Sequence, residues 1–61
     1  MNSEAKEKHL DIVDKLSLNK EFDAAFKYIN DTVDALFFPE EYNDLKQLVK
    51  DNALKFGIIL P

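Results

Sequence analysis

The stretch Phe22-Asp-Ala-Ala-Phe-Lys-Tyr-Ile-Asn-Asp-Thr-Val-Asp-Ala-Leu36 decides the fold. Its apolar residues recur at intervals of three and four positions: Phe22, Ala25, Phe26, Ile29, Val33 and Leu36. This spacing places them on one face of an α-helix. A second, weaker apolar line consists of Ala24, Tyr28 and Ala35. A helix with two apolar faces typically touches two neighbours, so we expect a helix over residues 20–36 in the middle of a bundle.

Two further amphipathic segments flank this one. Residues 4–16 have Ser3 as the expected N-cap and an apolar face of Ala5, His9, Ile12, Val13 and Leu16. Residues 39–56 begin with a proline, which suits the first position of a helix. Their apolar face consists of Tyr42, Leu45, Leu48, Val49, Ala53 and Phe56. The sequence therefore predicts an all-α fold, one helical domain over residues 1–61 that forms a small three-helix bundle.

The connections between the helices carry their own signals. Ser17–Lys20 is the first expected break, in which Asn19 is placed to cap the middle helix. At the second break, Pro39 disfavours helix at the residue before it. Phe37 and Tyr42 have the spacing of a hydrophobic staple, which would fix the angle at which the chain enters the third helix.

The C-terminal end combines a stop signal with an apolar tail. Gly57 stands where a left-handed cap of the third helix is expected, and Ile58 would then fold back onto Ala53. The last residues, Ile58–Pro61, are almost wholly apolar, whereas most chain ends are polar and frayed. The tail is therefore a candidate for packing, either inward or against a partner.

Composition and charge exclude several classes of function. The 61 residues include no Cys, which rules out disulfides and thiolate metal sites. The net charge is −4, and all eight basic residues are Lys. Nucleic acids and anionic membranes favour basic surfaces, and base recognition relies most often on Arg. We therefore expect neither nucleic acid nor membrane as a partner.

Localisation follows from hydropathy. The longest apolar run, Ala35–Phe38, has four residues and cannot span a membrane. The first eight residues contain no apolar core of the kind that signal peptides have. A cytoplasmic protein is expected.

Candidates for catalysis are few. His9 is the single histidine and lies within an apolar face. Without a Cys, or a Ser or Thr placed for activation, we expect a hydrogen-bonded imidazole at the edge of the core rather than a general base. Three short helices enclose little room for a pocket. We therefore expect no enzyme activity, cofactor, metal or small-molecule substrate.

An acidic ridge follows the first helix: Glu4, Glu7, Asp11 and Asp14. Calcium sites in helical proteins use loops rather than one helix face, so a metal site is not expected here. The plain interpretation is a solvated face with ion pairs to nearby lysines. The alternative is that the ridge mimics nucleic-acid phosphates and inhibits a DNA-binding protein.

Aromatic and aliphatic residues suggest a different surface. Phe37 and Phe38 cannot both point inward from so short a connection. Exposed apolar groups in a small protein tend to mark contact surfaces. The expected partner-binding residues are Phe37, Phe38, Tyr42, Ile59 and Leu60.

The function predicted on this basis is a small acidic protein-interaction module. It would act as a regulator, inhibitor or accessory factor of a larger protein. A chain of 61 residues buries little surface, so self-association as a homodimer could complete the bundle. Nucleic-acid binding through the connection between the second and third helices is the least favoured alternative.

Overall fold

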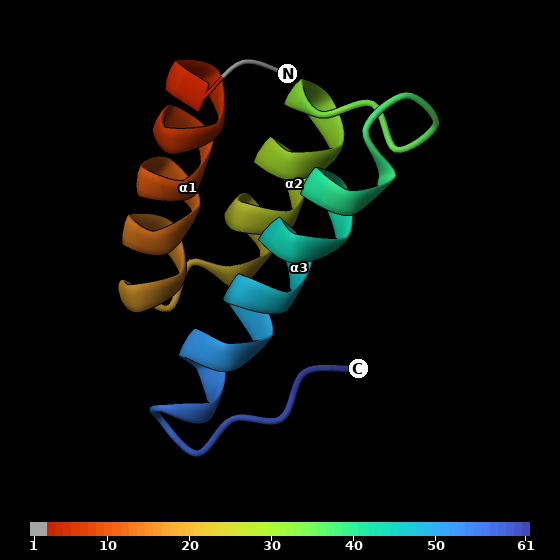
Figure 1. The fold of residues 1–61 in the computed structure, drawn as a ribbon. Coiled ribbons are helices and arrows are strands. Elements are labelled where there is room, and N and C mark those ends of the chain that lie inside the picture. Colours follow the sequence, from red (N-terminus) through yellow and green to blue (C-terminus); the bar gives the residue numbers. More distant parts are fainter. Residues whose placement is uncertain (1–2) are drawn as a thin grey trace.

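The computed structural model describes residues 3–61, which form three α-helices (Figure 1). Helix α1 spans Ser3–Leu18, α2 spans Phe22–Thr32 and α3 spans Pro39–Leu54. Helices α1 and α3 run in the same direction, α2 runs opposite to both, and each helix contacts the other two. The predicted all-α three-helix bundle is confirmed, and residues 3–61 contain no strand. No helix in this part of the chain has the length and hydropathy needed to cross a membrane.

The core lies where the three helices meet. Its fully buried apolar residues come from every helix and from the end of α2: Val13, Ala25, Ile29, Val33, Leu45, Val49 and Ala53. Half-buried large side chains enclose it, among them Leu10, Leu16, Phe22, Phe26, Tyr28 and Leu48. Most residues of the predicted apolar faces are therefore buried or half-buried, whereas Ala24 and Ala35 of the weaker line and two large residues are exposed. Leu36 is 90% exposed and Phe56 is 40% exposed.

Helix α2 ends at Thr32, so the prediction of helix through residue 36 is wrong. The Thr32 hydroxyl donates to the Tyr28 carbonyl oxygen at 2.6 Å. Val33 is extended, with φ −121° and ψ 119°. The Asp34 carboxylate then accepts a hydrogen bond from the Leu36 N–H at 2.8 Å. Thr and Asp side chains that bond to nearby backbone groups compete with the helix, and here they end it although the apolar period continues.

Helix α1 runs two residues beyond its expected end and stops in a Schellman motif. Lys20 adopts a left-handed conformation with φ 63° and donates its N–H to Ser17 at 3.1 Å. The Glu21 N–H donates to the Leu16 carbonyl oxygen at 2.9 Å. The predicted cap of α2 is corrected as a result. Glu21, not Asn19, is the N-cap of α2, and Asn19 Nδ2 donates to its carboxylate at 3.0 Å.

The predicted cap of α1 also differs from the structure. Ser3 is the first residue of the helix rather than the residue before it. A hydroxyl inside the first turn does not occupy the extended position from which a cap residue accepts the free N–H groups. The helix therefore begins one residue before the predicted start at residue 4.

Helix α3 ends at Leu54, two residues before its predicted end, and its cap is the predicted one. Gly57 has φ 74°, its N–H donates to Leu54 at 2.9 Å, and the Ile58 N–H donates to Ala53 at 3.0 Å. These two bonds define a Schellman motif. Phe56 lies within this motif, outside the helix, which explains why it does not reach the core as predicted.

Gly57→Ala is expected to lower the free energy of unfolding by about 1 kcal/mol. A Cβ at this position meets no atom within 4 Å, so the whole cost comes from the left-handed backbone. Urea unfolding followed by circular dichroism measures it. Gly57→Asn is the control, because Asn tolerates this conformation better. Equal stability of the Ala variant and the natural chain would contradict the expectation.

Candidate interaction surface

The connection between α2 and α3 exposes two large apolar side chains that are neighbours in sequence. Leu36 is 90% exposed and Phe37 is 78% exposed. They lie in residues 34–38, here termed the tip, which joins α2 to α3 and projects beyond the helices at one end of the bundle (Figure 1). The tip is the clearest candidate for a contact surface.

Hydrogen bonds and packing hold the tip in a defined turn. Asp34 anchors it twice: its side chain accepts the Leu36 N–H, and its carbonyl oxygen accepts the Phe38 N–H at 2.8 Å. The Phe38 side chain packs against the core. The expectation that only one of the two phenylalanines points inward is confirmed. Phe37 faces solvent, so the predicted staple between Phe37 and Tyr42 is wrong, because Phe38 occupies the inward position.

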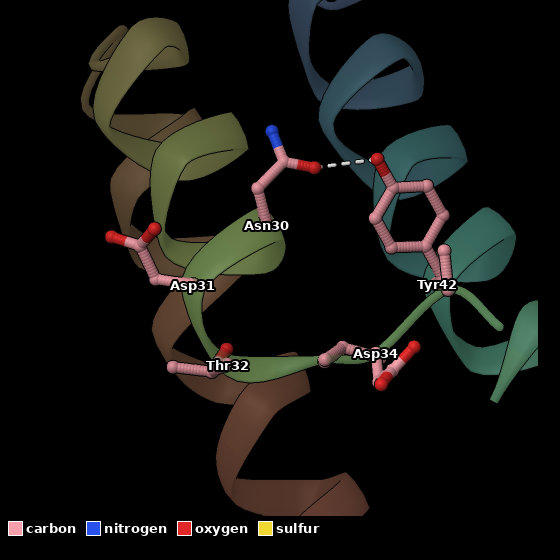
Figure 2. A pocket seen from close by; sticks show the side chains of 7 residues that line it. Asn30, Asp31, Thr32, Asp34 and Tyr42 are labelled. Carbon is pink, nitrogen blue, oxygen red and sulfur yellow. Dashed lines mark hydrogen bonds between the residues drawn. The ribbon is translucent and has the colours of Figure 1, made fainter. Parts of the chain in front are cut away.

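Below the tip, a side-chain hydrogen bond ties α2 to α3. The Tyr42 hydroxyl donates to Asn30 Oδ1, and Figure 2 shows the two side chains meeting across the gap between the helices. Residues 30–35 and Tyr42 line a shallow hollow here. Its carboxylates do not converge, and residues 3–61 contain no group of three potential metal ligands.

Asp31, at the edge of this hollow, forms an ion pair within its own helix. Its carboxylate lies 2.7 Å from Lys27 Nζ, one turn earlier. This hydrogen bond and the opposite charge raise the pKa of Lys27 above its ordinary value. In Figure 2 the Asp31 side chain points away from Tyr42.

The predicted partner-binding residues divide between two ends of the molecule. Phe37, Phe38 and Tyr42 lie at or below the tip, whereas Ile59 and Leu60 follow the far end of α3 (Figure 1). The 16 residues of α3 separate these ends by about 24 Å. Ile59 is 85% exposed, while Leu60 packs against the core. The tail therefore packs partly inward, and the five residues do not form one surface.

The acidic ridge of α1 is partly neutralised. Asp11 forms an ion pair of 3.0 Å with the lysine one turn later. Asp14 Oδ1 accepts a hydrogen bond of 2.8 Å from Asn52 Nδ2 on α3. Glu4 and Glu7 remain exposed. The ion pair offsets one of the four ridge charges, whereas the neutral amide of Asn52 leaves the charge of Asp14 in place.

A buried polar network joins α1 to α3, and the sequence interpretation missed it. Asn52, 1% exposed, donates from Nδ2 to Asp14 and also to Ser17 Oγ, at 2.8 Å each. Ser17 is fully buried and donates to the Val13 carbonyl oxygen at 2.8 Å. Ser17 therefore belongs to α1 and not to the predicted break. The burial of Ser17 could have been predicted from its position, because it lies four residues after Val13 and so continues the apolar face of the helix.

His9 lies at the edge of the core, as predicted. Its Nδ1 shares a hydrogen bond of 2.8 Å with the Tyr28 hydroxyl, and the two rings meet edge to face at 5.6 Å. The pair links α1 to α2. The predicted hydrogen bond of the imidazole is confirmed.

Comparison with known proteins identifies the family of the chain. A family model described as Lactococcus phage gp38-like protein matches residues 2–56. The chain belongs to this family. It is similar to "Gene product 38" of a Lactococcus phage, with 52% identity over 62 residues that cover 93% of this chain and 87% of the relative. No solved structure matches.

The match to the gp38-like family includes the features that position the candidate surface. Residues 2–56 contain all of α2 and α3, the tip and the Asn52 network. The apolar tail follows the matched range. The tip lies within the family match, as do the less exposed Leu18, Leu54 and Phe56.

Proposed function

We propose that this phage protein is a non-enzymatic protein-interaction module that regulates, inhibits or assists a larger protein by binding it through the tip. One observation carries the proposal: Leu36 and Phe37 are 90% and 78% exposed on an ordered turn. Adjacent large apolar side chains in solvent gain free energy when a partner buries them.

The order of the tip strengthens this argument. Binding costs free energy when a flexible loop must be fixed, and a turn already held by hydrogen bonds avoids much of that cost. Both Asp34 bonds and the packed Phe38 side chain hold the backbone of Leu36 and Phe37 in place. The tip can therefore act as a preformed apolar anchor, the kind of feature that dominates interface energies.

The hollow below the tip offers little for catalysis. Its lining contains amide, hydroxyl and carboxylate groups, but neither a His nor a Lys. A nucleophile paired with a base is the usual requirement for covalent catalysis. These features support a binding role over an enzymatic one.

Capture from lactococcal cells infected with a related phage tests the proposal. We expect the N-terminally tagged chain to retain a partner, and Leu36→Ser with Phe37→Ser to lower its recovery at least about tenfold. Helicity should persist, because both side chains are exposed. Quantitative mass spectrometry and circular dichroism are the measurements.

Ile59→Ser provides the matched control, since Ile59 is 85% exposed and lies in the C-terminal tail, outside the tip. It should leave recovery unchanged. Equal recovery with the natural chain and the double tip variant would refute the proposed role of the tip.

A further inference from the structure

The stretch of chain that contains the tip is acidic and is bordered by Lys27 and Lys46, of which Lys46 Nζ lies 5.3 Å from the centre of the Tyr42 ring. Residues 28–45 contain five acidic residues and no Lys: Asp31, Asp34, Glu40, Glu41 and Asp44. Asp31 is paired with Lys27, but among residues 3–61 the other four form no ion pair. We term these four the acidic rim, and they flank Leu36 and Phe37 on both sides along the chain.

The position of the rim determines which surfaces can cover the tip. Asp34 lies within the tip, and Glu40 and Glu41 lie in the first turn of α3. A partner that buries Leu36 and Phe37 therefore approaches the end of α3 that carries Glu40 and Glu41. Opposite charges at the edge of such an interface speed association and favour the correct partner, whereas like charges oppose it.

The rim also argues against a second copy as the occupant. A symmetric dimer through the tip would place the same patch of both copies face to face. Eight rim carboxylates, four from each copy, would then crowd around one apolar contact. Their mutual repulsion in a partly dry interface opposes that arrangement.

We propose that the tip docks in an apolar pocket of a different protein whose edge carries lysine or arginine side chains. This inference rests on the proposed function and adds the chemistry of the partner. Leu36 and Phe37 fill the pocket and supply most of the affinity. The rim meets the basic edge and supplies association rate and selectivity.

The test combines photocrosslinking with neutralisation of the rim. The full chain carries p-benzoylphenylalanine in place of Phe37 and is irradiated in lysate of phage-infected lactococcal cells. A second arm introduces Glu40→Gln with Asp44→Asn, which keeps side-chain shape and removes two rim charges. The control, Asp23→Asn with Asp51→Asn, removes two exposed charges at the other end of the bundle.

We expect crosslinks to a different protein, in an apolar segment flanked by basic residues. The rim variant should lower the yield about fivefold to tenfold at low salt, and the control should not. The yield of the natural tip should also fall as salt rises.

Three results would overturn the inference. Crosslinks between two copies of the chain would make the occupant a homodimer. The second result is a crosslink to another protein whose yield changes neither with salt nor in the rim variant. It would refute the inference that the partner's pocket has a basic edge, and the proposed function would still hold. Partner recovery that does not depend on Leu36 and Phe37 would overturn both.

Discussion

Asn52→Asp is expected to lower the free energy of unfolding by about 3 kcal/mol or more at neutral pH. Asn52 is 1% exposed and donates through Nδ2 to Asp14 Oδ1 and Ser17 Oγ. The substitution replaces this donor by a carboxylate oxygen and places it beside a second carboxylate. Burying an unpaired charge next to a like charge is among the costliest single changes in a protein.

The effect should depend on pH. The carboxyl introduced at position 52 is buried beside a second carboxylate, which raises the pKa of the introduced group in the folded variant. Stability is therefore lost as pH rises through that range and regained as pH falls. Urea unfolding of the variant at pH 4 and pH 7 measures this. Asn52→Ala is the control: it removes the donor without adding charge and should cost about 1–3 kcal/mol with no such pH dependence. A variant as stable as the natural chain at pH 7 would show that the network contributes little.

Ile29→Ala is expected to cost about 3 kcal/mol. Ile29 lies on α2, is fully buried, and is the largest of the fully buried side chains. The cavity left behind faces both neighbouring helices, because α2 packs against α1 and α3. A domain of this size has little stability in reserve, so the variant should unfold at a much lower temperature than the natural chain.

Thermal unfolding followed by circular dichroism measures this loss. Ile29→Val keeps most of the volume and should cost only about 1 kcal/mol. If the Ala variant unfolds cooperatively at the same temperature as the natural chain, then Ile29 does not lie in a tightly packed core.

Apolar periodicity predicted a helix well where the capping residues at its end agree with the end of the apolar face. The face of α3 and its glycine cap are examples, since Leu45, Val49 and Ala53 are buried and Gly57 is left-handed as expected. The period failed at the end of α2. There Thr32 and Asp34 bond to the backbone and end the helix, a competition that counting apolar residues does not weigh.

The candidate site was only partly predictable. The short connection before Pro39 predicted that one of Phe37 and Phe38 is exposed but not which one, and the expected staple placed Phe37 against Tyr42 instead. Leu36 was assigned to the core because it continues the apolar period of α2.

Ser17 and Asn52 are polar residues at buried positions. Asn52 donates to partners at least 35 residues away, and Ser17 accepts one of these bonds while its hydroxyl donates locally to Val13. Such pairing depends on how α1 and α3 pack, which one local stretch of sequence does not specify.

The contact between α1 and α3 also bears on the order in which the chain assembles. Helices α1 and α2 are joined by three residues and α2 and α3 by six, so each of these pairs can form locally and quickly. The Ser17–Asn52 bond instead closes a loop of 35 residues that contains all of α2. Its formation is favoured once α2 has docked on one neighbour. We therefore expect the buried polar network to form late, so that its removal speeds unfolding more than it slows folding.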